Sequence, residues 1–177
     1  MELKVAEFLV GMALVFCGSS LVFRTEFCEY LLRKFLRSET ANTLTFSVAG
    51  AWFLGHVLTL GESDFGQYKY LFFIFFLTII LVALSKLRDF LSVRGAAILA
   101  LLAANELLKV AYMQPHISRL ILVAFVYAAI VAGMIFGGWP YRGRDFVDFL
   151  FLHPTRPRLC GLGVTSYGIL LLTTLFW

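Results

Sequence analysis

Six apolar segments of about 20 residues each dominate this chain. A helix needs about 20 mostly apolar residues to cross a bilayer, so each segment is long enough for one crossing. The 19 Phe residues fit lipid-facing helices, and no run of about ten alternating residues indicates a barrel. We therefore predict an all-α integral membrane protein with six transmembrane helices. The predicted spans are residues 5–23, 41–60, 70–87, 93–112, 120–139 and 159–177.

Composition excludes a soluble fold. The chain is 60% hydrophobic and only 15% charged, with a mean hydropathy of +0.87. A soluble domain of 177 residues cannot hide that much apolar surface. No connection between spans exceeds about 20 residues, which is too short for a separate fold. We predict one transmembrane domain over residues 1–177.

The segment 93–112 has the most informative pattern of the six. Its first half carries small residues, which let neighbouring helices approach closely in lipid. Its second half carries Asn105, Glu106 and Lys109, groups that are costly in lipid unless they find partners or water. A span that is small on one side and polar towards one end is typical of the inside of a helix bundle.

Other spans also carry small residues that predict close packing. Gly11 and Gly18 lie in the first span, and Gly133 and Gly137 form a GxxxG motif in the fifth. Such motifs occur in many apolar spans, so we favour helix contact within the chain over dimerisation through this motif. The sixth span adds a further group, namely Gly161, Gly163 and Gly168.

Positive charge is unevenly placed along the chain. Eleven of the fifteen Lys and Arg residues fall in the first, third and fifth connections. Basic residues concentrate on the cytoplasmic side of membrane proteins, so we predict three cytoplasmic loops with both termini outside. The net charge of +4 then reflects topology and predicts no nucleic-acid partner. Basic loops and the absence of sorting tails favour a multi-pass protein of a bacterial inner membrane.

The first connection, residues 24–37, has apolar and charged faces at helical spacing. It predicts an amphipathic helix on the cytoplasmic membrane surface, more simply an interfacial connector than a protein-docking element. Residues 26–31 (EFCEYL) match residues 145–150 (DFVDFL) of the fifth connection. The first and third pairs of spans also share the order of span, acidic-aromatic stretch and Gly-rich span. The chain is therefore predicted to repeat three helical hairpins, each with its bend in the cytoplasm.

Ionisable residues inside the predicted spans form one candidate site. At 1.5 Å per residue, His56 and Glu106 lie about 6 Å and about 9 Å from the outer ends of their helices. Intramembrane ionisable groups suggest a site with named partners, and we expect Glu106 to pair with Lys109 and Glu7 with His56. The alternative is that Lys109 snorkels to the outer interface, that Glu7 is itself interfacial, and that His56 is a hydrogen-bonded packing residue. The full candidate cluster is Glu7, His56, Asn105, Glu106 and Lys109.

A second candidate site lies on the cytoplasmic side. Arg-Asp pairs precede an aromatic residue in the third and fifth connections. One interpretation is that the acids cap helices or balance nearby arginines at the headgroup level. The other is a site for docking or for lipid headgroups. The residues concerned are Arg88, Asp89, Arg144 and Asp145.

Recognised catalytic and metal motifs do not occur in the sequence. There is no GxSxG, HExxH, Walker loop or CxxC. We therefore interpret the three cysteines, Cys17, Cys28 and Cys160, as small hydrophobic packing residues. The histidines His56, His116 and His153 lack the spacing of a haem or metal site. We predict no catalytic residues, metal or cofactor.

The function that these features favour is that of a non-enzymatic integral membrane subunit or scaffold. Its expected partners are the lipid bilayer and either other membrane subunits or further copies of the chain. The Phe-rich third span and the small-residue faces support this prediction. The alternative is a small channel or transporter that uses the outer polar cluster, although no Gly or Pro interruption at midplane indicates one.

Overall fold

The computed structural model describes residues 3–61, 65–86, 91–116 and 118–176. About 90% of the chain is helical, and the described residues contain no strand, so the all-α prediction is confirmed. The elements in chain order are α1 (Leu3–Phe23), α2 (Thr25–Arg37), α3 (Glu39–Leu58), η2 (Gly66–Tyr68), α4 (Lys69–Lys86), α5 (Leu91–Ala111), α6 (Ser118–Gly138), α7 (Tyr141–Phe151), α8 (Thr155–Thr173) and η3 (Thr174–Phe176).

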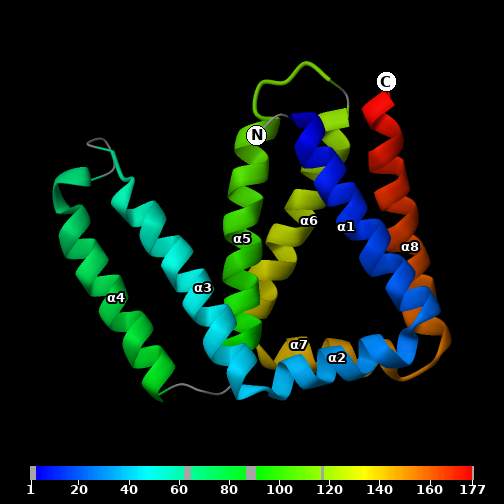
Figure 1. The fold of residues 1–177 in the computed structure, drawn as a ribbon, viewed down its shortest axis with the longest axis horizontal. Helices are drawn as coiled ribbons and strands as arrows, with labels where there is room; N and C mark the ends of the chain where they lie inside the picture. The colour runs from blue at the N-terminus through cyan, green and yellow to red at the C-terminus, as the bar shows by residue number, and fades with distance from the viewer. Residues whose placement is uncertain (1–2, 62–64, 87–90, 117, 177) are drawn as a thin grey trace.

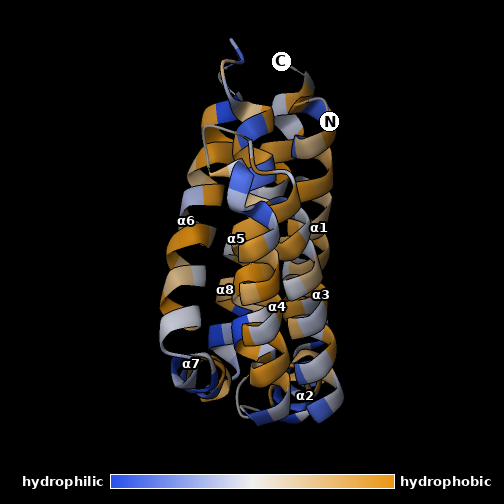
Figure 2. Cartoon of the chain, turned by 90° about the vertical axis from the view of Figure 1, so that its left-hand side faces the viewer, coloured by the Kyte–Doolittle hydropathy of each residue, from blue (hydrophilic) through white to orange (hydrophobic). Residues whose placement is uncertain are grey.

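The long helices run side by side between two ends, as Figure 1 shows. The N- and C-termini lie at the same end, which we call the terminal end. The shorter helices α2 and α7 lie across the opposite end, which we call the α2/α7 end. The long helices are mainly hydrophobic along their middles, and hydrophilic residues gather at both ends and on α2 and α7 (Figure 2).

Among the described residues, four helical segments are long and apolar enough to cross a membrane, which confirms the membrane character of the chain. They are α1, Gly66–Lys86, α5 and α6. The other two predicted spans correspond to α3 and α8, which are of similar length. Their sequences are more polar, since α3 begins ETANT and α8 begins TRPR. Six crossings therefore stay a prediction.

The predicted amphipathic helix over residues 24–37 is confirmed, because α2 covers Thr25–Arg37. The matching stretch of the fifth connection is also a helix, α7, which buries Val147 and Leu150. Prolines set its limits: Pro140 precedes α7 and Pro154 precedes α8. Proline is tolerated at a helix start but interrupts a helix interior, so α8 begins directly after Pro154, four residues before the start of the span predicted at 159–177.

Helices α2 and α7 are joined by charge at the end where they lie together. The Nη1 atom of Arg33 donates to Oδ1 of Asp148, 2.5 Å away, and its Nε donates to Oε1 of Glu29 at 2.9 Å. The hydrogen bond to Glu29, with that to Asp148, raises the pKa of Arg33. Glu29 and Asp148 are equivalent positions in the two matching stretches, so one arginine binds both copies of the repeated acid.

The first and last long helices, α1 and α8, make the most extensive helix contact. Glycines face each other along it in two pairs. A Cβ added to Gly161 would lie 2.8 Å from the carbonyl oxygen of Gly18, and one added to Gly168 would lie 2.9 Å from that of Gly11. Because those distances leave no room for a methyl group, the backbones can approach this closely only where both helices carry glycine.

Helix α5 lies between α3 and α6 and also contacts α1 and α2, which confirms the prediction that residues 93–112 belong inside the bundle. A Cβ on Gly95 would lie 2.8 Å from the backbone nitrogen of Phe46 on α3. On the other side, Gly133 and Gly137 of α6 both lie next to Ala97 of α5. The GxxxG motif therefore makes a contact within the chain, as expected.

A polar contact holds α3 to α5 at the α2/α7 end. The side-chain oxygen of Asn42 accepts a hydrogen bond of 2.8 Å from the backbone nitrogen of Ser92, and both residues are buried. The first backbone N–H groups of a helix have no partner within the helix. Asn42 therefore caps α5 from a neighbouring helix.

The main contacts differ from those of three tightly packed sequential hairpins. The long helices that pack extensively are α1 with α8, α5 with α6, and α3 with both α5 and α4. After α1 and α6 the chain turns through α2 and α7 instead of a short loop. The hairpin repeat therefore stays a prediction.

The close glycine contact between α1 and α8 predicts that a methyl group added there lowers stability. Gly161→Ala should lower the free energy of unfolding by about 1–3 kcal/mol, because its methyl group would force the two backbones apart. Gly163, on the same helix, has open space where a Cβ would lie, so Gly163→Ala is the matched control. Thermal unfolding of the purified protein in detergent measures both. Equal midpoints for the two variants would contradict the close contact.

Candidate functional site

Four of the five predicted intramembrane residues come together around one oxygen atom. Oε1 of Glu106 lies 3.0 Å from Nε2 of His56 and 3.0 Å from Nζ of Lys109. The same oxygen accepts a longer hydrogen bond of 3.4 Å from Nδ2 of Asn105. We call these four residues the Glu106 cluster. The predicted pair of Glu106 with Lys109 is confirmed.

The cluster joins α3 to α5 towards the terminal end. Glu106 is five residues before the end of α5 at Ala111, which corresponds to about 8 Å along the helix axis. His56 comes from the last turn of α3, and its Nδ1 lies 3.2 Å from the carbonyl oxygen of Trp52. Both ring nitrogens thus lie within hydrogen-bond distance of an oxygen, one on its own helix and one on α5.

The cluster is only partly covered by the chain itself. The side chains of His56, Glu106 and Lys109 are 31%, 42% and 58% exposed. Ion pairs that are this exposed to water contribute about 0–1 kcal/mol to the free energy of folding. In a bilayer the same groups would meet hydrocarbon or headgroups, where uncovered charge is costly. The exposed side of the cluster therefore requires cover from water, headgroups or another polypeptide.

Glu7 lies apart from the Glu106 cluster. The predicted pair of Glu7 with His56 does not form, since His56 binds Glu106 and Oε1 of Glu7 has no hydrogen-bond partner. Successive helix residues turn by about 100°, so Ala104 and Ala111 face the core cluster that contains Ala6 while Glu106 faces α3. Glu7 and the Glu106 cluster were predicted at a similar depth in the membrane. They do not meet, because α5 lies between them.

The second candidate site is described only in part. Arg88 and Asp89 lie outside the described residues. Arg144 and Asp145 are exposed on α7, and Arg144 lines a small cavity of about 50 Å³ with Arg33 and Asp148. The acid that links α7 to α2 is Asp148 and not Asp145. The signal that could have identified Asp148 is its equivalence to Glu29 in the repeated stretch.

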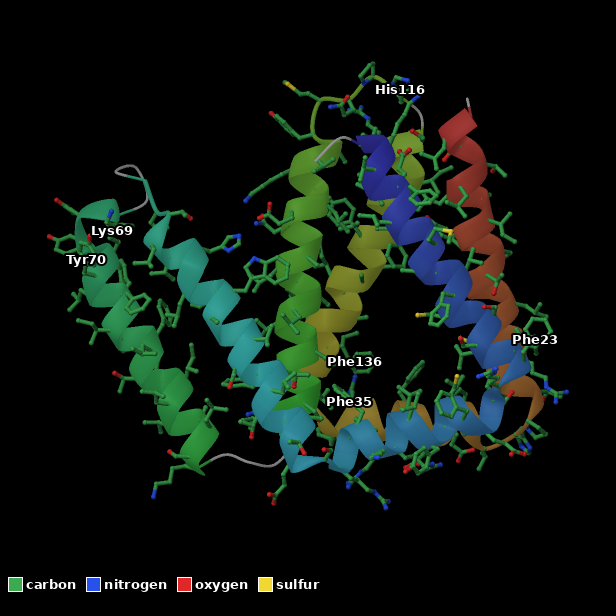
Figure 3. The ribbon with its side chains drawn as sticks, viewed as in Figure 1. Phe23, Phe35, Lys69, Tyr70, His116 and Phe136 are labelled. Atoms are coloured by element: carbon green, nitrogen blue, oxygen red, sulfur yellow. The ribbon has the colours of Figure 1, made fainter. Side chains whose placement is uncertain are left out.

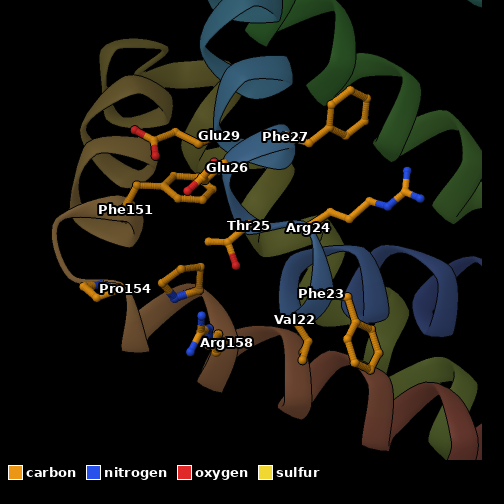
Figure 4. A pocket seen from close by; sticks show the side chains of 11 residues that line it. Val22, Phe23, Arg24, Thr25, Glu26, Phe27, Glu29, Phe151, Pro154 and Arg158 are labelled. Atoms are coloured by element: carbon orange, nitrogen blue, oxygen red, sulfur yellow. The ribbon is translucent and has the colours of Figure 1, made fainter.

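A larger cavity at the α2/α7 end was not predicted. It has a volume of about 490 Å³ and lies where the junction of α1 with α2 meets that of α7 with α8 (Figure 4). Apolar side chains such as Phe23 and Phe151 line it together with charged ones such as Glu26 and Arg158. Sequence reasoning missed it because its two halves are more than 120 residues apart along the chain.

The cysteines and histidines form no recognisable centre. Cys17, Cys28 and Cys160 are free thiols, and burial together with the nearby Cys17 raises the pKa of Cys28. Within the described ranges no group of three or more His, Cys, Asp or Glu side chains is placed to hold a metal ion. His116 belongs to the connection at the terminal end (Figure 3), whereas His56 binds Glu106.

Comparison of the chain with protein-family models, curated proteins and solved structures gives no match. The class of the protein therefore follows from the chain itself. Over the described residues it is all-helical, with four helices long and apolar enough to cross a membrane and a polar cluster in which one carboxylate oxygen is shared between two helices.

We test whether the Glu106 cluster holds the terminal ends of α3 and α5 together. Glu106→Gln removes the charge that three donors share, so the terminal ends of α3 and α5 should separate, with a stability loss of about 1 kcal/mol. Spin labels at Thr59 and Tyr112, both exposed, report that spacing by pulsed electron paramagnetic resonance. A second pair at Thr40 and Arg94, near the Asn42 cap, should be unaffected. A 59–112 distance distribution identical to wild type would show that the cluster does not hold these helices.

Proposed function

We propose that the chain is a non-enzymatic integral membrane subunit that assembles laterally with other membrane subunits or with copies of itself. The observation that carries this proposal is the half-exposed Glu106 cluster within a candidate span. Uncovered charge at that depth is costly in lipid, and a neighbouring polypeptide supplies cover that hydrocarbon cannot. The cluster then helps to specify where the neighbour binds.

Helix α4 supports the same proposal. It packs mainly against α3, and Ala83 is its one buried residue among those described. Its outward side presents large apolar side chains, among them Leu71, Ile74 and Phe75, each more than half exposed. Since α3 carries His56, a subunit seated along α3 and α4 would also approach the Glu106 cluster. One interface would then cover both features.

The channel or transporter alternative has less support. It requires Glu7, His56, Glu106 and Lys109 to line one polar path. Glu7 lies across α5 from the other three, and His56 and Lys109 are both occupied by Glu106. Held in ion pairs, these groups are better suited to an assembly contact than to a moving solute.

We further propose six crossings, with both termini outside, in a bacterial inner membrane. Helices α3 and α8 run alongside the four candidate spans and have similar lengths (Figure 1). The termini share one end, and most basic residues lie on α2 and α7 or directly beside them at the other. That distribution is the one expected for a cytoplasmic α2/α7 end.

Single cysteines test this topology in a variant that lacks Cys17, Cys28 and Cys160. Positions 30, 67 and 149 are exposed on α2, η2 and α7. A membrane-impermeant maleimide should label position 67 in intact cells, and positions 30 and 149 only after lysis. Labelling of positions 30 and 149 from opposite sides would overturn both the orientation and the count of six.

Lateral assembly is tested by photo-crosslinking in the native membrane. A photoreactive amino acid at Ile74, on the outward side of α4, should form an adduct with a second copy or with a stoichiometric membrane protein that co-purifies. Ile169 on α8 is exposed to a similar degree and serves as the control position. The adduct should decrease in Glu106→Leu. A monomeric mass in lipid nanodiscs, with no adduct from either position, would contradict the proposal.

A further inference from the structure

Glu7 is the most unusual residue of the described chain. Its side chain is on α1, and the residue is only 1% exposed, yet Oε1 of its carboxyl group has no hydrogen-bond partner. The neighbouring Leu3 and Ala6 pack in the core with Leu122 and Leu171. Burying a carboxylate without a partner is strongly unfavourable, and an unsatisfied buried polar group requires an explanation.

A cavity adjoins Glu7 at the terminal end. It has a volume of about 280 Å³ and is formed by the start of α1, the connection from α5 to α6, the start of α6, and η3. Its polar lining includes Gln114, His116, Ser118 and Thr174. The hydroxyl of Thr174 donates to the carbonyl oxygen of Leu171 at 2.7 Å, so the Thr174 oxygen is left to accept.

The chemistry of this lining favours a cation that donates hydrogen bonds. The carboxylate of Glu7 provides the one acidic group, while Gln114, Ser118 and Thr174 each offer a neutral oxygen. A primary ammonium carries three N–H donors and one positive charge. The neutral oxygens of the lining can accept its hydrogen bonds, and the Glu7 carboxylate balances its charge. Ca²⁺ and Mg²⁺ fit less well, because sites for them normally combine several carboxylates.

The cavity is also of suitable size and position for such a group. One water molecule takes about 30 Å³ of liquid volume, so 280 Å³ accommodates a short aminoalkyl group. The termini and the α5–α6 connection surround the cavity at the end of the bundle. If the chain crosses the membrane as proposed, this is the level of the lipid headgroups.

We propose that the Glu7 cavity binds a primary ammonium group, with Glu7 as its counter-ion. The group belongs either to the ethanolamine headgroup of a lipid or to a small soluble amine. This site is separate from the Glu106 cluster and does not depend on lateral assembly.

Lys4 provides the competing explanation. It lies three residues before Glu7 and lines the same cavity, and residues at that spacing are neighbours on a helix. Lys4 is exposed and makes no ion pair among the described residues. A swing of its ammonium towards Glu7 would satisfy the carboxylate without a ligand. The two explanations predict different effects of removing the Lys4 ammonium on the binding of an amine at Glu7.

The test measures lipid retention by native mass spectrometry of the detergent-purified protein, titrated with phosphatidylethanolamine or phosphatidylcholine of equal chain length. Wild type should prefer the ethanolamine lipid by about tenfold or more, because the quaternary choline has no N–H to donate. Glu7→Gln should lose that preference. Lys4→Met should keep or increase it, and Glu39→Gln, which removes an exposed carboxylate at the start of α3, should leave it unchanged.

Free ethanolamine identifies the source of the ammonium group. A Glu7-dependent preference for the ethanolamine lipid, with displacement of that lipid at millimolar ethanolamine, supports the proposal with a lipid as the source. Glu7-dependent binding of ethanolamine alone, detected by saturation-transfer nuclear magnetic resonance with equal retention of the two lipids, supports it with a soluble amine as the source. Equal retention of both lipids by wild type, together with no Glu7-dependent ethanolamine binding, would overturn it. A preference that is absent in wild type and appears only in Lys4→Met would overturn it in favour of a Lys4–Glu7 pair. If Glu7→Gln does not fold, the wild-type preference between the two lipids tests the lipid source, and binding of ethanolamine alone to wild type tests the soluble source.

Discussion

The close approach of α1 and α8 is the contact on which the rest of the arrangement depends. In lipid, apolar side chains gain little by leaving one hydrocarbon environment for another, so helices associate where their backbones come close. Gly11 and Gly18 meet Gly168 and Gly161 in register, with no space for a single methyl group on either helix. This contact joins the two ends of the chain, and it explains why both termini lie at one end of the bundle (Figure 1).

Helix α5 gives the bundle two chemically different sides. Towards α1 it presents Ala104 and Ala111, which pack with Leu122 and Leu171 in the hydrophobic core. Towards α3 it presents Glu106, whose single oxygen is shared by donors from two helices. The same helix therefore separates the buried carboxylate of Glu7, which has an unpaired oxygen, from the half-exposed carboxylate of Glu106, which is held in ion pairs.

The α2/α7 end shows how a repeated sequence becomes a structural joint. The two stretches match in sequence, and their helices lie together with Arg33 between the equivalent acids Glu29 and Asp148. Hydrogen bonds to charged partners are stronger than neutral ones, although exposure to solvent weakens them here. The wide turns through α2 and α7 also keep the sequential long helices from packing as tight pairs, and the cavity of Figure 4 lies where those turns meet.

The sequence by itself determined the helical fold, its membrane character, the limits of the long helices to within about four residues and the amphipathic helix over 24–37, although it did not predict α7 as a helix. These follow from length, hydropathy and local periodicity, which act over one or two helical turns. It also predicted that Glu106 and Lys109 pair, because they lie on adjacent turns of one helix. Only the tertiary structure decided that His56 joins Glu106, that Glu7 faces a separate cavity, and that Arg33 meets Asp148. The physical reason is that a helix presents every direction around its axis, and the face that a residue occupies acquires a neighbour only when distant helices are packed against it.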